Sequence, residues 1–364
     1  MSHILCLSAY DAASHQHWHQ LLRRELSEWD WQLLALPARN FSWRIRGNPL
    51  YWAQQCRDVL EQPYDLVLAT SMVDLATLRG LVPKLGLIPT ILYFHENQFE
   101  YPAGRGQHGM LEAQMVSLYA AMAADLLLYN SDYNRQTFMD GCAALLRRLP
   151  DAIPDNVVAD LVAKSQLLPV PLEDWPVQPQ SSLSKRLQLL WNHRWEYDKG
   201  PAQLLSLAEQ LVAENVPFTL HVVGQQFRQQ PPEFEQLREV LQQAAALGRW
   251  GYIDKSSDYQ ALLQSCDVVL STARQDFQGL AVLEACAAGC VPLVPDRLVY
   301  REWFAPEYRY QDLHQAGQRI VELHHLKRAG DDLPVVDVSR FSSARLIPQY
   351  RAVLRSQFRL NCVS

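Results

Sequence analysis

Residues 271–295 read STARQDFQGLAVLEACAAGCVPLVP, and this segment is the most informative part of the chain. An apolar run ends at Ser271, a polar turn follows, and Gly279 precedes apolar residues at helical spacing that continue to Gly289. A second apolar run, residues 291–294, comes directly afterwards. Strand, helix and strand in this order are typical of a βα unit in a parallel sheet.

The same alternation extends through the rest of the chain. Strands are predicted at residues 4–8, 31–36, 66–70, 90–94 and 126–129, and then at 187–191, 218–223, 267–271 and 291–294, with helical segments between them. Most of these runs are apolar throughout and do not alternate with polar residues, which indicates sheets covered on both faces. We therefore expect an α/β protein.

A proline-rich stretch in the middle of the chain separates the two groups of strands. Residues 169–182 read PVPLEDWPVQPQSS, and proline is costly inside a helix or a central strand. We predict an N-terminal domain at 1–172, a linker at 173–184, a C-terminal domain at 185–340 and a helical segment at 341–364 that packs back on the N-terminal domain. Two Rossmann-like, doubly wound domains facing across a cleft are the expected architecture, with ligands beyond the carboxyl ends of the strands.

Composition excludes several classes of protein. Hydrophobic residues make up 48% and charged residues 20% of the 364, as in ordinary globular chains, and a net charge of −6 argues against broad non-specific binding of nucleic acid. The seven cysteines form no C-x-x-C pair, which favours reduced thiols in a cytoplasmic protein. We expect no signal peptide, no membrane span and no obligate protein partner.

The turn before Gly279 has the chemistry of an anion site. Glycine leaves the first amides of the following helix bare, at Leu280 and beyond, where the positive end of the helix dipole suits a diphosphate. Two carboxylates, Asp276 and Glu284, stand on either side with seven residues between them. The alternative is that a βα turn carries a glycine and two acids by chance.

A second segment favours the anion site over chance. Residues 191–200, WNHRWEYDKG, follow the first strand of the C-terminal domain and place Arg194 and Lys199 at its carboxyl end. A guanidinium and an ammonium together can bind a diphosphate and neutralise the charge that develops on it as a leaving group.

These two segments resemble the retaining GT-B glycosyltransferases of the glycogen-synthase-like superfamily. The resemblance implies that Arg194 and Lys199 grip the donor diphosphate, and that Asp276 and Glu284 stand at the two acids of the family's E-x7-E pair. The first acid is Asp in place of Glu, one methylene shorter. Further donor contacts are assigned to Gly224, Tyr252 and Ile253.

The N-terminal half narrows the resemblance. Residues 46–53 (RGNPLYWA), 93–102 (YFHENQFEYP) and 129–138 (YNSDYNRQTF), together with 191–200, look like the signature of the tRNA-queuosine mannosyltransferase family. Membership implies transfer of mannose from GDP-mannose to the cyclopentenediol of queuosine in the anticodon of tRNA(Asp). It also implies attack on the same face of the sugar that the diphosphate leaves.

Two histidine-containing loops remain to be interpreted. His95 directly follows an apolar strand and is expected to orient the transferred sugar, although a structural histidine is the alternative. Ser14 and His15 lie in the first loop and are assigned to the donor, where Ala12 and Ala13 replace the expected glycines. We expect no metal, because alternate spacing puts only His15 and His19 on one helix face and no D-x-D motif is present.

The acceptor is expected to meet the N-terminal half. The aromatic residues around Arg44 and Arg46 have the composition of a surface that stacks on RNA bases, and Asn48, Trp52, Asn97 and Gln98 are assigned to the same surface. For Trp52, packing in the core is an equal alternative. Two other functions remain open at this point: a GT-B epimerase or phosphorylase, and a non-catalytic tRNA- or sugar-binding protein on this scaffold.

Overall fold

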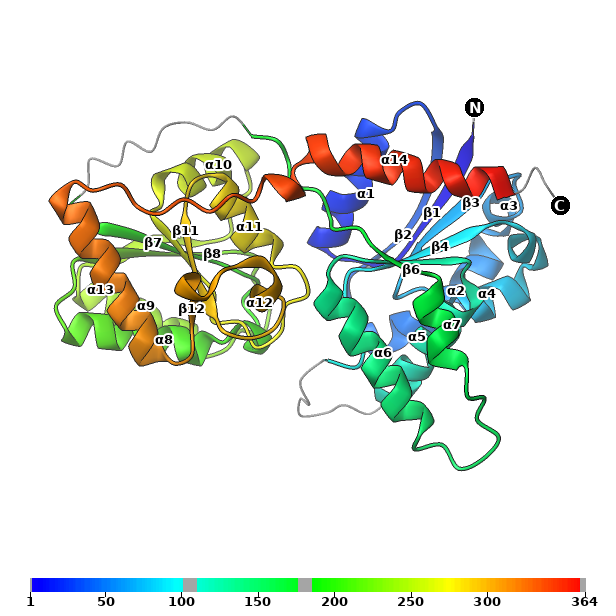
Figure 1. Cartoon of the computed structure of the whole chain (residues 1–364), viewed down its shortest axis with the longest axis horizontal. Helices are drawn as coiled ribbons and strands as arrows, with labels where there is room; N and C mark the ends of the chain where they lie inside the picture. Colours follow the sequence, from blue (N-terminus) through cyan, green and yellow to red (C-terminus); the bar gives the residue numbers. More distant parts are fainter. Residues whose placement is uncertain (1, 101–109, 176–184, 361–364) are drawn as a thin grey trace. The chain divides into compact units, whose positions relative to one another are not determined.

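The computed structural model describes residues 2–100, 110–175 and 185–360, and residues 176–184 of the expected linker lie outside this range. The chain divides into two compact units (Figure 1). Unit 1 comprises Met1–Pro171 together with Ser343–Ser364, and unit 2 comprises Leu172–Ser342.

Unit 1 is built on a six-stranded parallel sheet in the order β2-β1-β3-β4-β5-β6. Its strands are β1 (His3–Asp11), β2 (Asp30–Pro37), β3 (Leu66–Thr70), β4 (Thr90–Phe94), β5 (Leu126–Tyr129) and β6 (Ser165–Leu167). Every residue of β3, β4 and β5 is buried, which accounts for their unbroken apolar sequences.

Helices cover both faces of this sheet. They are α1 (Ala13–Glu25), α2 (Phe41–Gln55), α3 (Arg57–Leu60), α4 (Leu75–Leu81), α5 (Met110–Ala123), α6 (Asp132–Leu146), α7 (Val157–Ala163) and α14 (Ser343–Leu360), with a 3₁₀ turn η1 (Pro83–Leu87). The connection from β1 to β2 steps toward one edge of the sheet, whereas the connections from β2 to β3, β3 to β4 and β4 to β5 step toward the other. Because such crossovers are right-handed, α1 lies on the face opposite to α2, α4 and α5.

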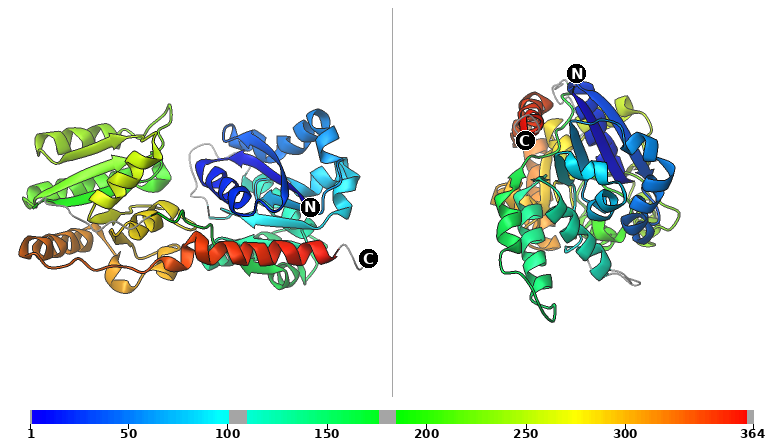
Figure 2. Two further views of the ribbon diagram at one scale, coloured as in Figure 1. Left: turned by 90° about the horizontal axis from the view of Figure 1, so that it is seen from above. Right: turned by 90° about the vertical axis from the view of Figure 1, so that its right-hand side faces the viewer.

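The C-terminal helix α14 packs beside α1 and completes unit 1 (Figures 1 and 2). The indole Nε1 of Trp18 donates to the Tyr350 hydroxyl at 3.0 Å, and the Tyr350 hydroxyl donates to the Pro169 carbonyl at 3.1 Å. Both aromatic side chains are buried. The core of unit 1 therefore includes side chains from the two ends of the sequence.

Unit 2 contains a second six-stranded parallel sheet, in the order β12-β11-β10-β7-β8-β9. Its strands are β7 (Leu187–Asn192), β8 (Phe218–Val223), β9 (Leu247–Gly251), β10 (Val268–Leu270), β11 (Val291–Pro295) and β12 (Arg309–Tyr310). The nine predicted strands are all present, and β6, β9 and β12 are additional.

The helices of unit 2 also form two layers. They are α8 (Pro201–Ala213), α9 (Glu233–Gln243), α10 (Ser256–Ser265), α11 (Leu280–Ala287), α12 (Tyr300–Trp303) and α13 (Leu313–Ala329), with 3₁₀ turns η2 (Tyr197–Lys199), η3 (Pro306–Tyr308) and η4 (Ser339–Phe341). Helix α8 packs with α9 and α13, while α10 packs with α11 on the other face (Figure 1). Strand order reverses between β7 and β10, which is where a doubly wound sheet opens a crevice for ligands.

None of the helices within residues 2–100, 110–175 and 185–360 combines the length and apolar character needed to cross a bilayer.

Candidate active site

The predicted donor residues of unit 2 share one edge of its sheet. Arg194 and Lys199 follow β7, Gly224 follows β8, Tyr252 and Ile253 follow β9, and the remainder follow β10: Asp276, Gly279, Leu280 and Glu284. The carboxyl ends of parallel strands lie at the same edge, so the fold gathers these residues from four separate parts of the sequence.

Lys199 is a buried cation held between carboxylates. Only 8% of the residue is exposed, and its Nζ donates to the Gln275 carbonyl at 2.6 Å. The same Nζ lies 3.6 Å from a carboxylate oxygen of Asp198 and 3.6 Å from one of Asp276. These contacts offset the cost of burying the ammonium and fix it next to the first acid of the pair.

Arg194 is more accessible than Lys199. Its Nη1 lies 2.6 Å from the Glu196 carboxylate and its Nη2 lies 3.5 Å from that of Asp198. Burial raises the pKa of Glu196, although Arg194 opposes this shift. An anionic ligand would therefore compete with acidic side chains for this guanidinium.

Both carboxylate oxygens of Asp276, in the turn before α11, accept hydrogen bonds. Oδ1 accepts from the Gly279 amide at 3.0 Å, and Oδ2 accepts from the Tyr300 hydroxyl at 2.9 Å. Burial would raise the pKa of Asp276, but Lys199, His193 and these two hydrogen bonds outweigh it, and the pKa is lowered. Asp276 is therefore an anion that the surrounding groups hold in one orientation.

Gly279 allows this turn because its backbone is left-handed, with φ of 72°. Helix α11 begins at the next residue, and none of the described side chains caps its amino end. The amides from Leu280 onward therefore face the same edge as Lys199, as the sequence predicts for an anion site.

The second acid, Glu284, is also positioned by a tyrosine. The Tyr259 hydroxyl donates to Glu284 Oε2 at 2.9 Å, and Asn192 Nδ2 donates to the Tyr259 hydroxyl at 3.0 Å. Sequence reasoning missed both Tyr259 and Tyr300. They lie 25 and 24 positions away from the acids they contact, and no local motif marks them.

His193, which directly follows β7 and precedes Arg194, is a further polar group at this edge and has no role implied by the family resemblance. It is buried, and burial together with the nearby charge of Lys199 lowers its pKa to about 4. Its imidazole is therefore neutral near pH 7. The carboxylate of Asp276 is among the charges that act on the pKa of His193, and it opposes the lowering.

In unit 1, His95 lies in a buried cluster of aromatic rings at the carboxyl end of β4. Its ring stacks on that of His15 at 4.1 Å between centroids and meets the edge of Trp18 at 4.9 Å. Burial lowers the pKa of His95 well below its usual value, and the neighbouring histidines add to this effect. Its Nε2 is buried and has no hydrogen-bond partner within the described part of the chain.

His15 connects this cluster to a carboxylate. Its Nε2 lies 3.1 Å from Glu96 Oε2, while Ser14 precedes it at the second position of α1. The other two histidines of this segment have different partners, since His19 contacts Asp11 and His17 contacts the Pro171 carbonyl. Within residues 2–100, 110–175 and 185–360, no group of three or more His, Cys, Asp or Glu side chains could hold a metal ion.

Burial argues against direct RNA contact by four predicted acceptor residues. Asn48 and Trp52 lie on the inner side of α2, and Trp52 is only 1% exposed, so the alternative of core packing holds for it. Asn97 is buried as well, and its Nδ2 donates to the Asn134 side chain. Gln98 is buried beside Met72. All four side chains pack inside unit 1 and do not present polar groups to solvent.

The two predicted acceptor arginines are not equivalent. Arg46 Nη1 lies 2.5 Å from the buried carboxylate of Asp74, and its Nε lies 3.1 Å from Glu112 Oε1. Arg44 makes no ion pair with a described carboxylate, and its Nε has no partner among the described residues. Arg46 therefore has a structural role, whereas Arg44 retains an uncompensated charge.

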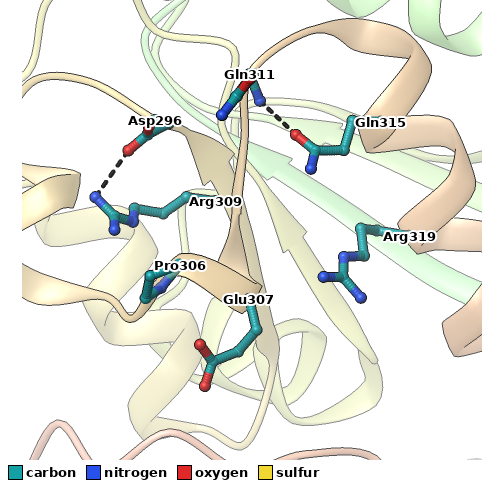
Figure 3. A pocket seen from close by; sticks show the side chains of 7 residues that line it. All are labelled: Asp296, Pro306, Glu307, Arg309, Gln311, Gln315 and Arg319. Atoms are coloured by element: carbon teal, nitrogen blue, oxygen red, sulfur yellow. Dashed lines mark hydrogen bonds and ion pairs between the residues drawn. The ribbon is translucent and has the colours of Figure 1, made fainter.

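A hollow of about 420 Å³ lies at the outer edge of the unit 2 sheet (Figure 3). No predicted site residue is among those that line it, which are Asp296, Pro306, Glu307, Arg309, Gln311, Gln315 and Arg319. Its arginines face acids, since Arg309 pairs with Asp296 and Arg319 with Glu322. This hollow is separate from the donor residues around β7 and β10.

Solved structures of glycosyltransferases share this fold. HepE of Anabaena in complex with UDP and glucose superposes with a TM-score of 0.66 at 13% identity, covering 98% of this chain and all of that chain. Sucrose-phosphate synthase of Thermosynechococcus elongatus gives a TM-score of 0.68 at 14% identity, covering 99% and 100%. The expected GT-B fold is confirmed.

Sequence comparison identifies the family. The model of the tRNA-queuosine alpha-mannosyltransferase N-terminal domain matches residues 3–172, and that of the group 1 glycosyl transferases matches residues 177–311. A tRNA-queuosine alpha-mannosyltransferase of Drosophila melanogaster is 30% identical over 96% of this chain and 95% of its own length. The expectation of a hexosyltransferase is confirmed, and the chain belongs to the tRNA-queuosine alpha-mannosyltransferase family.

Proposed function

We propose that this enzyme transfers mannose from GDP-mannose to the cyclopentenediol of queuosine at the wobble position of tRNA(Asp), with retention at the anomeric carbon. The observation that carries the donor half of the proposal is the arrangement at the β7 and β10 ends. A buried ammonium, a helix amino terminus and two oriented carboxylates share one edge there. The acceptor half rests on family membership.

The unit 2 residues suit a nucleoside diphosphate sugar. Lys199, Arg194 and the amides that follow Gly279 provide positive charge for the diphosphate. Glu284, oriented by Tyr259, is assigned to the ribose hydroxyls, and Asp276 to the sugar. HepE, which shares the fold, was crystallised with UDP and glucose, which supports this class of ligand.

The proposed reaction breaks the bond between the anomeric carbon and the diphosphate oxygen. A hydroxyl of the cyclopentenediol forms the new bond on the same face and passes its proton to the departing diphosphate. The chain then contributes positioning and charge stabilisation, for which Lys199 and Arg194 are the principal groups. Neutral His95 is assigned to a hydroxyl of the transferred sugar through its unpartnered Nε2.

Two further expectations accompany this proposal. No metal is required, because the two cations take the place that a bound divalent ion would have beside the diphosphate. The enzyme acts in the cytoplasm, a placement that agrees with the free thiols of all six cysteines in the described part of the chain.

The test is a mass spectrum of the nucleosides of tRNA(Asp) after incubation with the enzyme and a sugar nucleotide. GDP-mannose is compared with UDP-glucose and GDP-glucose, and queuosine-bearing tRNA with tRNA that carries guanosine at the wobble position. We expect a hexose added to queuosine from GDP-mannose alone. Equal reaction of the guanosine form would overturn the acceptor assignment. Preference for another donor would overturn the donor assignment and mean that this family member transfers a different sugar.

A further inference from the structure

Helix α2 presents aromatic side chains to solvent on the face opposite its core contacts. Trp43 and Tyr51 are 55% and 48% exposed, and Leu50 is also exposed. The buried side of the same helix carries Ile45, Asn48, Pro49, Trp52 and Ala53. Trp43 and Tyr51 are eight residues apart, so they lie on one side of the helix, roughly 12 Å from each other along its axis.

Gly47 lies between these two aromatic residues and shapes the surface. A Cβ built on Gly47 would lie 2.4 Å from Cε2 and 2.6 Å from Cζ2 of Trp43. The indole therefore rests against the bare backbone of the helix at Gly47. Glycine favours a helix less than alanine does, and here it allows the indole to lie against the helix.

Two uncompensated cations border this surface at the start of α2. Neither Arg39 nor Arg44 forms an ion pair with a carboxylate in the described part of the chain, whereas Arg46 is paired with Asp74 and Glu112. Flat aromatic rings beside free guanidinium groups favour a ligand with planar rings and negative charge, which describes a nucleic acid better than a protein surface.

The position of α2 agrees with a role at the acceptor. Phe41, the first residue of α2, contacts the ring of Tyr10 on β1 at 6.0 Å, so α2 begins at the carboxyl edge of the unit 1 sheet, where His95 also lies. The family-specific sequence match covers residues 3–172, which include α2, whereas the general glycosyltransferase match covers residues 177–311.

We propose that the outward face of α2, formed by Trp43, Gly47 and Tyr51 with Arg39 and Arg44, is a stacking surface for unpaired bases of the acceptor tRNA. This inference deepens the proposed function and rests on it. Stacking is tolerant of sequence, so the surface supplies affinity for the anticodon loop, and recognition of queuosine itself is left to other groups.

The first experiment measures the affinity of the full-length enzyme for a queuosine-containing anticodon stem-loop RNA. Trp43→Ala and Tyr51→Ala should each weaken binding by about 5- to 150-fold, the range expected for losing one stacked base. Leu87→Ala removes an even more exposed apolar side chain and should not change affinity. Donor binding should be unchanged in all three variants.

Gly47→Ala is the sharper variant, because it adds one methyl group and displaces the indole. We expect weaker RNA binding with a thermal midpoint that is unchanged or higher, since alanine favours the helix. Gly80→Ala is the matched control: it also lies in a helix, and a Cβ there meets nothing within 4 Å. Equal affinity of the Gly47→Ala and Gly80→Ala enzymes would count against the surface.

A third measurement isolates the cations. Arg44→Gln should reduce the slope of log affinity against log salt by about 0.7, while Arg328→Gln, an exposed arginine in unit 2, should not. Failure of this inference is separable from failure of the proposed function. If wild-type enzyme modifies tRNA and the α2 variants keep its KM for tRNA, only the inference falls; if wild-type enzyme modifies no tRNA, the proposed function falls.

Discussion

The hydroxyl of Tyr300 donates to Oδ2 of Asp276 at 2.9 Å, and Ser271 Oγ lies 2.8 Å from the same hydroxyl. Tyr300 is fully buried and is the first residue of α12, while Asp276 precedes α11. The shorter acid that replaces Glu in the E-x7-E pair is thus held by a phenol that the motif does not contain.

Tyr300→Phe should release one oxygen of Asp276 and lower kcat/KM by about tenfold, because a hydrogen bond to a charged group contributes about 1.5 to 3 kcal/mol. The control is Tyr310→Phe, which also removes a buried hydroxyl, one that donates to the Ser271 carbonyl at 2.8 Å without contacting Asp276. Steady-state kinetics on both variants decide the matter. Equal losses would mean that the effect is one of stability alone.

The Arg194→Ala and Lys199→Ala variants should both lose turnover but should differ in thermal stability. Both variants should lose at least tenfold in turnover, because each removes a charge-assisted partner of the diphosphate. Only Lys199→Ala should also lower the thermal midpoint, since it leaves the carboxylates of Asp198 and Asp276 without their buried partner. Wild-type turnover in either variant would remove that residue from the mechanism.

Arg46→Ala should destabilise unit 1 and leave RNA affinity unchanged. Removing the guanidinium leaves the buried Asp74 carboxylate uncompensated, and we expect a loss of roughly 1 to 2 kcal/mol, reduced by the partial exposure of Arg46. Arg319→Ala breaks a surface pair with Glu322 and should cost about 0.5 kcal/mol or less. Urea unfolding of the two variants provides the comparison, and similar midpoints would contradict the structural role.

The folded enzyme should lose stability as the pH falls from about 6.5 toward 4. Burial lowers the pKa of His221 to about 4 and contributes most to the similar shift of His193, so the unfolded chain takes up these protons first and the free energy of unfolding decreases. His221 Nδ1 accepts from the Arg249 amide at 2.9 Å and cannot do so when protonated. Urea midpoints between pH 7 and pH 4.5 should therefore decline less in His221→Gln than in the wild type, whereas the exposed His314→Gln should follow the wild type.

Activity should survive chelation. In the proposed donor site, Lys199 and Arg194 supply the positive charge for the diphosphate in place of a divalent ion, so we expect dialysis against EDTA to leave the rate of transfer unchanged. Loss of activity on chelation, with recovery on adding Mg²⁺ or Mn²⁺, would show that the donor site is interpreted wrongly.

The strands that sequence reasoning missed share a position in the fold. β6, β9 and β12 each lie at an edge of their sheet, where fewer residues are covered. β9 contains two glycines and an arginine, and β12 has only two residues. Apolar runs mark strands that are buried on both faces, so a method that relies on such runs finds the centre of a sheet before its edges.

The residues of the candidate site also fall into those that the sequence reveals and those that only the structure reveals. Glycine, acids and cations next to strand ends were visible in the sequence, as was His193 directly after β7, whereas Tyr259 and Tyr300 enter the site through tertiary contacts. The two readings of Trp52 could be separated from the sequence, because Ile45, Asn48, Pro49 and Trp52 follow helical spacing and so indicate a buried face. That spacing assigns Trp52 to the core and leaves Trp43 and Tyr51 outside.

The inclusion of α14 in unit 1 has a consequence for folding during synthesis on the ribosome. A ribosome releases β1 to β6 long before residues 343–360 are synthesised, and until then Trp18 lacks the Tyr350 hydroxyl that accepts its indole N–H. Unit 2 is contiguous in sequence and can complete its fold first, while the N-terminal domain must wait for the last helix to emerge. Nascent chains stalled shortly before residue 343 should therefore expose an apolar face of unit 1 to chaperones.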